Sequence, residues 1–172
     1  MISVLGQADL SLARNVEVTA ASTWPGTEYV DLLGEAPSLD LPECSNEEFE
    51  RLRLTMGLPV IGKEIMVGDI PNETDLLDIA VSFDKGCYRG QELVERIDSR
   101  SGGRRLIRRL ESDGALRPGD ELGFEEEVVG EVLTITNDAP YVGFGRLRAD
   151  VEAADGPESQ RVNVASVHQA TI

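Results

Sequence analysis

The chain has 172 residues, of which 41% are hydrophobic and 28% are charged, and its formal net charge is −16. This composition predicts a soluble globular protein of one ordinary domain or two small ones, and it argues against a disordered or membrane protein. The net negative charge also argues against non-specific nucleic-acid binding by the whole surface, because phosphate backbones would be repelled.

The first 15 residues contain no basic region followed by an apolar run, and no stretch approaches about 18 consecutive apolar residues. We therefore expect a cytoplasmic protein. The two cysteines, Cys44 and Cys87, lie far apart in the sequence, and His168 is the only histidine. A structural zinc site needs about four closely grouped ligands, so we expect no zinc. His168 lies in a valine-rich segment typical of a strand, which disfavours a catalytic role for it.

The amino-terminal part of the chain predicts a hairpin and then a helix. Residues 16–33 predict two strands around a turn at 24–27. A helix is expected over 46–56, where Ser45 and Glu48 form a capping-box pattern and apolar residues recur at helical spacing. Residues 58–84 predict a loop-rich segment that ends in a short apolar run. A short helix is expected from about Cys87 to Ile97.

A break at Ser101-Gly102-Gly103 separates this part from a series of short strands. The expected strands share short length and flanking turn signals: 104–111, 120–124, 127–136, 141–149 and 161–167. Such a series is typical of a small antiparallel barrel or sandwich. The sequence therefore predicts an α+β protein with a boundary near residue 101, giving domains of 1–100 and 101–172.

Basic residues are concentrated in one segment of this acidic chain. Residues 85–109 hold eight basic side chains against three acidic ones. One explanation is a solvated surface with an arginine-rich composition. The other is a basic face for an anionic ligand or partner, such as a polyglutamyl tail or RNA. The sequence leaves both explanations open.

The segment Lys85-Gly86-Cys87-Tyr88-Arg89-Gly90-Gln91-Glu92 has the strongest chemical character in the chain. Two glycines permit close backbone approach, and a cysteine near a helix start would be favoured as a thiolate by exposed amides and by the positive helix end. Lys85 and Arg89 would act in the same direction. Alternatively, Cys87 is a small buried apolar residue and the glycines form a turn.

This segment resembles the KGCY and GQE signature of the YgfZ family. Further resemblance lies in four other segments: Arg53–Pro59, Gly62–Glu64, Ile70–Glu73 and Gly130–Thr134. The hairpin at 16–33 is similar to the middle of the family's folate domain. The resemblance implies the carboxy-terminal portion of such a protein, with part of an aminomethyltransferase-like folate-binding domain followed by a small antiparallel β-barrel. Family members continue upstream with an amino-terminal half that completes the folate channel.

The resemblance also implies a function and a set of site residues. It implies a folate-binding factor that supports assembly or repair of iron–sulfur enzymes, including tRNA-modifying ones, with Cys87 as the functional thiol. Tetrahydrofolate or a derivative would be contacted by Arg53, with Asp31 near the matching acidic position. The loop around Cys87 would be shaped by its neighbours in the motif: Lys85, Gly86, Tyr88, Gly90, Gln91 and Glu92.

Two other functions compete with this one. A tetrahydrofolate-dependent aminomethyltransferase would need a general base that the family carries in the amino-terminal half. A non-enzymatic interaction module would use the surface that the shortened folate domain leaves open. The expected partners are iron–sulfur enzymes or assembly factors and either a separate amino-terminal half or a second copy. A role for tRNA is expected only indirectly, and no membrane partner is expected.

Overall fold

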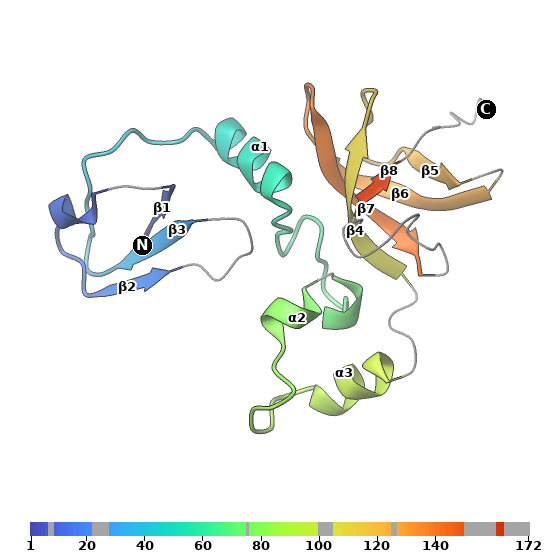
Figure 1. Ribbon diagram of the computed structural model, residues 1–172, viewed down its shortest axis with the longest axis horizontal. Coiled ribbons are helices and arrows are strands. Elements are labelled where there is room, and N and C mark those ends of the chain that lie inside the picture. The colour runs from blue at the N-terminus through green and yellow to red at the C-terminus, as the bar shows by residue number, and fades with distance from the viewer. Residues whose placement is uncertain are drawn as a thin grey trace. The chain divides into compact units, whose positions relative to one another are not determined.

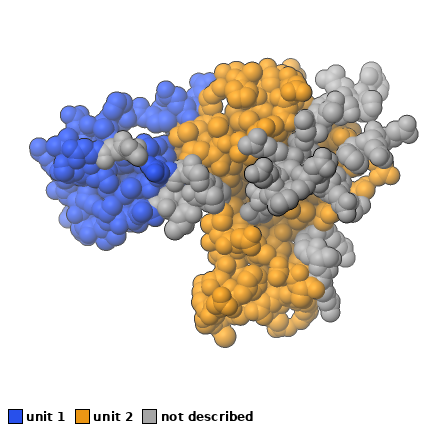
Figure 2. All heavy atoms as spheres, viewed as in Figure 1, with its two compact units in different colours: residues 1–48 blue, residues 49–172 orange. Residues whose placement is uncertain are grey.

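The computed structural model describes residues 1–6, 9–21, 28–74, 76–99, 105–124, 127–149 and 161–163. They fall into two units, unit 1 over residues 1–48 and unit 2 over residues 49–172 (Figure 2). The domain boundary expected near residue 101 lies at 100–104, outside the described residues. The division into domains of 1–100 and 101–172 therefore stays a prediction.

Unit 1 is built on a three-stranded antiparallel sheet in the order β1-β3-β2 (Figure 1). Its elements are β1 (Ile2–Leu5), the 3₁₀ turn η1 (Leu10–Leu12), β2 (Val18–Ala21) and β3 (Tyr29–Leu33). The pairing of β2 with β3 confirms the hairpin expected at 16–33, although its turn at 24–27 lies outside the described residues. Strand β1 was not expected from the sequence. Val4 and Leu32 are the only fully buried hydrophobic residues among those described in this unit.

Helix α1 spans Asn46–Met56, as the sequence predicts. The capping box forms as expected: the Glu48 amide donates to Ser45 Oγ at 3.2 Å, and the Ser45 amide donates to Glu48 Oε2 at 2.9 Å. These two hydrogen bonds satisfy amides that a helix start otherwise leaves without partners. The hydrogen bonds from Ser45 hold the pKa of Glu48 below its usual value.

The main sheet of unit 2 has five strands in the order β5-β6-β7-β4-β8. Its strands are β4 (Arg105–Ser112), β5 (Glu121–Phe124), β6 (Glu127–Ile135), β7 (Tyr141–Arg148) and β8 (Arg161–Asn163). Apolar side chains are buried in two clusters. One contains Leu110, Leu122 and Leu147 within the sheet, and the other joins Leu54 of α1 to Ile107 and Phe144. Helix α1 therefore packs against this sheet.

Glycines in β7 allow the sheet to pack this tightly. A Cβ atom on Gly145 would lie 2.7 Å from Leu122 Cδ1 and 2.8 Å from Leu110 Cδ1. A Cβ on Gly143 would lie 2.0 Å from the Thr134 carbonyl oxygen. The pairing of β6 with β7 is also shifted between Val132 and Thr134, which is typical of a β-bulge. The strands can therefore approach more closely than side chains would permit.

The α+β class is confirmed, but the expected closed antiparallel barrel is wrong for the described residues. Strands β5 and β8 are the two edges of the sheet and do not pair with each other. Closure needs hydrogen-bonded edge strands with a matching stagger, and these edges are only 4 and 3 residues long. In addition, β8 runs parallel to β4, a pairing that requires a crossover and that short-strand patterns do not reveal.

Three short elements connect α1 to the main sheet: η2 (Pro71–Glu73), α2 (Leu77–Ala80) and α3 (Gln91–Asp98). The helix expected from Cys87 begins four residues later than predicted. Gly90 caps α3 with a φ of 90°, which interrupts right-handed helical backbone at that position. Cys87 therefore precedes the helix, and the part of its expected activation that depends on helix-start amides has no basis.

Candidate functional site

Cys87 lies in an exposed loop between α2 and α3 and forms no disulfide. The loop is held by contacts among its own residues. Lys85 Nζ lies 5.3 Å from the centre of the Tyr88 ring, a cation–π contact. The Tyr88 amide donates to Gln91 Oε1, and the Gln91 amide donates to the Tyr88 carbonyl, both at 3.3 Å. The motif residues thus shape the loop on which the thiol is presented.

Side chains of α3 continue this network along the helix. Gln91 Nε2 donates to Glu95 Oε1 at 2.7 Å, and Arg96 Nη2 donates to Glu92 Oε1 at 2.6 Å. Both pairs are spaced four residues apart and stabilise the helix surface modestly. Gln91 therefore links the loop to the first two turns of the helix, whereas Glu92 is engaged on the helix surface.

The segment Ile70–Glu73, noted for its family resemblance, lies against α3. Asn72 Nδ2 donates to the Val94 carbonyl at 3.2 Å, and the Val94 side chain is buried. Asn72 Oδ1 and the Tyr88 hydroxyl are buried polar atoms without a partner in the described residues. Buried polar atoms are usually hydrogen-bonded, so these two retain unused capacity near the start and middle of α3.

Arg53 belongs to a buried cluster of charged and polar groups in unit 2. Its Nη1 and Nη2 atoms donate to the two carboxylate oxygens of Glu64 at 3.1 and 3.0 Å. Its Nε and Nη2 atoms donate to Glu50 Oε2 at 2.9 and 2.7 Å, and Nη1 also donates to the Leu58 carbonyl. Arg53 is 1% exposed and Glu64 is 0% exposed. All five guanidinium N–H groups therefore have partners within the protein.

Glu64 extends this cluster to the main sheet. Thr134 Oγ1 of β6 donates to Glu64 Oε1 at 2.6 Å, and the Val60 amide donates to Glu64 Oε2 at 2.8 Å. Arg146 of β7 donates to the Glu64 carbonyl at 3.3 Å and forms an ion pair with Asp69 at 2.7 Å. The cluster joins α1, the segment after it and the sheet, and so unites three segments that carry the family resemblance.

Hydrogen bonds within the cluster favour the ionised forms of Glu50 and Arg53. The hydrogen bonds from Arg53, followed by the weaker influence of Lys63, lower the pKa of Glu50 to about 2. Lys63 Nζ lies 2.6 Å from Glu50 Oε1. Burial opposes the charge on Arg53, but its hydrogen bonds to Glu50 and Glu64 leave its pKa raised. Sequence analysis marked Glu64 only as part of the resembling segment Gly62–Glu64, and its buried role could not be predicted because its partners are distant in sequence and no local periodicity marks it.

The expected site residues lie in three parts of the chain. Asp31 lies on β3 of unit 1, where it accepts a hydrogen bond from Ser3 Oγ at 2.5 Å. Arg53 lies in unit 2, within the buried cluster. Lys85, Tyr88 and Gln91 do lie together around the cysteine loop, and Gly86 and Gly90 belong to the same loop. The loop is therefore one site, and the two residues expected to contact folate belong to other parts of the chain.

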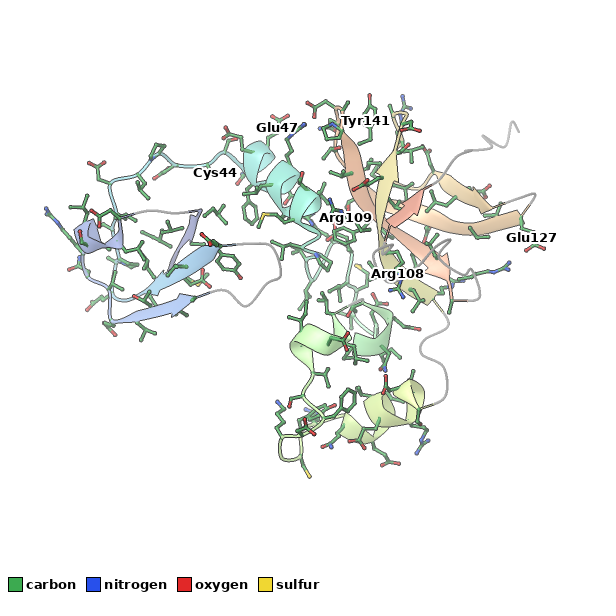
Figure 3. The ribbon with its side chains drawn as sticks, in the orientation of Figure 1. Cys44, Glu47, Arg108, Arg109, Glu127 and Tyr141 are labelled. Atoms are coloured by element: carbon green, nitrogen blue, oxygen red, sulfur yellow. The ribbon has the colours of Figure 1, made fainter. Side chains whose placement is uncertain are left out.

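The second thiol, Cys44, is also exposed (Figure 3). Its Sγ donates to the Ser45 carbonyl at 3.3 Å.

Among the described residues no group of three or more His, Cys, Asp and Glu side chains is arranged to hold a metal ion. No helix in the described parts of the chain combines the length and apolar character required to cross a membrane.

No family model matches the chain. Curated proteins do match it. The tRNA-modifying protein YgfZ of Hamiltonella defensa is 30% identical over 113 residues, which cover 65% of this chain and 31% of that protein. The YgfZ protein of Buchnera aphidicola is 36% identical over 96 residues, covering 55% of this chain and 27% of that protein. The YgfZ protein of Escherichia coli is 32% identical over 113 residues, covering 65% and 32%.

The chain spans about a third of the length of the curated relatives that it matches. A chloroplast protein of Arabidopsis thaliana, named as a candidate transferase, is 27% identical over 103 residues, which cover 58% of this chain and 24% of that protein. The resemblance to the YgfZ family is thus supported by several relatives that carry the YgfZ name. These comparisons support a YgfZ-type protein, since the similarity to several YgfZ proteins extends over as much as 65% of this chain.

Proposed function

We propose that the chain acts as a YgfZ-like factor that supports assembly or repair of iron–sulfur enzymes, including tRNA-modifying ones, with Cys87 as the functional thiol. The observation that supports this is the exposed Cys87 on a loop ordered by the Lys85–Tyr88 contact and by the Tyr88–Gln91 hydrogen bonds. The relatives named as tRNA-modifying proteins support the choice of enzymes served.

The loop suits a thiol that must reach another molecule. Cys87 is exposed, and a Cβ atom placed on either Gly86 or Gly90 would meet no atom within 4 Å. The thiolate form of cysteine coordinates iron and exchanges with disulfides, and neighbouring cations favour that form. Lys85 and Arg89 provide two cations at positions two residues before and after the thiol.

Tetrahydrofolate is the proposed cofactor. Residues 1–100 are proposed to be part of an aminomethyltransferase-like folate-binding domain. The assigned residues fit this ligand poorly in the chain by itself. Every N–H group of Arg53 donates within the protein, and Asp31 already accepts a hydrogen bond from Ser3. Titration of the chain with tetrahydrofolate, monitored by ligand fluorescence, tests the proposal, and absence of saturable binding would contradict it.

A separate amino-terminal half, or a second copy of the chain, is the proposed partner of unit 1. This is supported by the small number of buried hydrophobic side chains in the described part of that unit, Val4 and Leu32, and by exposed Leu12, Val18 and Leu41. Such a sheet buries too little apolar surface for independent stability. The same observation favours the interaction-module alternative, in which the chain works only as a binding surface.

Complementation distinguishes these functions. In cells that lack their own YgfZ-type protein, the chain should restore the activity of an iron–sulfur tRNA-modifying enzyme, and Cys87→Ala should abolish that effect. Cys44→Ala is the matched control, because it removes the other exposed thiol. If Cys87→Ala restored the enzyme activity as well as the parent chain does, the assignment of Cys87 as the functional thiol would be wrong. An aminomethyltransferase, the alternative that the chloroplast relative's name supports, would instead release ammonia from an aminomethyl donor in the presence of tetrahydrofolate.

A further inference from the structure

A second site lies on unit 2, away from the cysteine loop in sequence. A cleft of about 370 Å³ is lined by residues of β4, β5, β6 and β7 and by Gly119 in the turn before β5. This volume falls in the range of small-ligand sites. Five charged residues line the cleft: Arg105, Arg146, Arg148, Glu121 and Glu131. The function proposed above uses none of them.

The strand register separates these charges into two ends. Arg105 of β4 lies directly opposite Arg148 of β7, and Arg146 lies opposite Ile107 and Glu131. Glu131 of β6 in turn lies opposite Glu121 of β5. Residues opposite each other on antiparallel strands point to the same face, as do residues two positions apart. The cleft therefore has an arginine end at β4 and β7 and a carboxylate end at β5 and β6.

Both ends contain charges that the protein does not neutralise. Within the described parts of the chain, the side chains of Arg105, Glu121 and Glu131 have no hydrogen bond or ion pair. Like charges directly opposite each other on neighbouring strands are destabilising. Arg105 with Arg148, and Glu121 with Glu131, are both arrangements of this kind. A ligand that carries the opposite charge or polarity at each end would relieve both.

The remaining two arginines are compatible with a ligand. Arg148 donates to Glu127 at 3.3 Å, with side-chain exposures of 47% and 70%; Glu127 begins β6 (Figure 3). An exposed pair of this kind contributes about 0–1 kcal/mol, so the Glu127 contact does not prevent Arg148 from also binding an anion. Arg146 is held in position by Asp69 and by the Glu64 carbonyl, and it forms a fixed part of the cleft lining beside Arg105 and Arg148.

We propose that this cleft binds a phosphate-bearing small molecule of mononucleotide size. The phosphate lies between Arg105 and Arg148, whose planar guanidinium groups match phosphate oxygens. Glu121 and Glu131 accept hydrogen bonds from amino or hydroxyl groups at the other end of the ligand. A polyanion that filled the whole cleft would meet these two carboxylates, and the net charge of −16 would repel it further. The site therefore favours a single phosphomonoester over an RNA strand.

Three probes separate the two ends of the cleft in titrations of the full chain. AMP carries a phosphate and an amino group, ribose 5-phosphate lacks the base, and adenosine lacks the phosphate. AMP should bind most tightly, and it should shift the backbone amide signals of Gly119 and Gly130, which line the cleft. Arg105→Gln removes a charged hydrogen bond, so it should lower the affinity for AMP about tenfold and leave the affinity for adenosine unchanged. Glu121→Gln should lower the affinity for AMP but not the affinity for ribose 5-phosphate.

Arg117→Gln is the matched control, because it removes the same charge at an exposed position that does not line the cleft. Its AMP affinity should equal that of the parent chain. Three results would overturn the proposal: no saturable shift of the Gly119 and Gly130 amides with AMP, equal weakening by Arg117→Gln and Arg105→Gln, or tighter binding of a short RNA than of AMP. Since Cys87 is not involved, complementation by these variants distinguishes this site from the proposed thiol function.

Discussion

At the scale of single residues, the Arg53–Glu64 pair is the most consequential contact in unit 2. Replacing Glu64 by alanine leaves a buried guanidinium without its fully buried counter-charge, which should lower the free energy of unfolding by about 3–5 kcal/mol. Urea denaturation followed by circular dichroism measures this loss. Lys63→Met is the matched control, because it removes an exposed ion pair to Glu50 and should cost at most about 1 kcal/mol.

The double variant Arg53→Met/Glu64→Leu completes that comparison. It removes both buried charges and fills the space with apolar atoms, so it should be more stable than Glu64→Ala. If the double variant were as unstable as Glu64→Ala, the loss would arise from packing around the cluster rather than from an unpaired charge.

Glu50 gives unit 2 a defined response to acid. Its pKa in the folded protein is lowered from 4.5 to about 2, first by the hydrogen bonds from Arg53. A carboxyl group whose pKa is lowered by folding stabilises the folded state fully above its unfolded value, and this stabilisation is lost as the pH falls from 4.5 through about 2. Glu50→Gln should therefore show a weaker dependence of stability on pH over that window.

Urea midpoints measured between about pH 5 and pH 2, the range in which carboxyl groups titrate, measure this effect. Glu47→Gln, at an exposed position on the same helix, should retain the pH dependence of the parent chain (Figure 3). Identical slopes for the parent and Glu50→Gln would contradict the coupling between Glu50 and Arg53.

The two thiols provide a third prediction at this scale. Both are exposed, so access does not distinguish them. Cys87 has Lys85 and Arg89 nearby in sequence, whereas Cys44 is followed by Glu47 and Glu48 and preceded by Glu43. Cations favour the reactive thiolate and carboxylates disfavour it. Iodoacetamide should therefore label Cys87 first; earlier labelling of Cys44 in peptide mass spectra would reverse the assignment.

At the scale of elements, close approach between β6 and β7 depends on Gly143. An added Cβ would lie 2.0 Å from the Thr134 carbonyl oxygen and 2.7 Å from Ile135 Cα, so the strands would have to separate. Gly143→Ala should lower the free energy of unfolding by about 3 kcal/mol or more. Gly114→Ala is the control, because its Cβ would meet nothing within 4 Å. Thermal unfolding of both variants checks the difference.

Local interactions made several elements predictable from the sequence. Helix α1 was located because its capping residues, Ser45 and Glu48, are three positions apart and bond to each other. The strands of the main sheet were located because turn residues separate them. The start of α3 was misplaced because the left-handed backbone of Gly90 depends on the conformation of the whole turn.

Long-range interactions made the remainder unpredictable. The parallel pairing of β8 with β4 joins residues such as Arg109 and Arg161, and nothing in either segment specifies its partner. For the candidate site, the motif located the cysteine loop. The burial of Arg53, however, depends on Glu64, 11 positions away, and Glu64 in turn accepts a hydrogen bond from Thr134, 70 positions further along the chain. Resemblance identified Arg53 as important without revealing this structural role.

At the scale of the whole molecule, the two units should differ in local stability. Unit 1 has two fully buried hydrophobic residues among those described, whereas the main sheet of unit 2 has two apolar clusters. Amide exchange reflects the free energy of local opening, which rises with buried apolar contact. The amides of β1, β2 and β3 should therefore exchange much faster than those of β4, β6 and β7.

Hydrogen exchange with mass spectrometry checks this gradient in the full chain. A partner that covers unit 1, either a separate amino-terminal half or a second copy, should slow the exchange of β1, β2 and β3 and leave β7 unchanged. Uniform protection of both sheets in a chain that light scattering shows to be monomeric would contradict the idea that unit 1 needs a partner.

The buried position of Glu64 also constrains the order in which a ribosome can deliver a foldable chain. Its contacts with Thr134 and Arg146 span 70 and 82 positions. A nascent chain that has emerged only to the end of α3 carries Arg53 and Glu64 but neither of those partners. Protein domains generally fold during synthesis as their segments become available, and exposed intermediates are prone to aggregate. Slow translation between α3 and β7 should therefore prolong the time during which Arg53 and Glu64 lack their partners in the main sheet. A chaperone is most useful to this protein during that stage of synthesis.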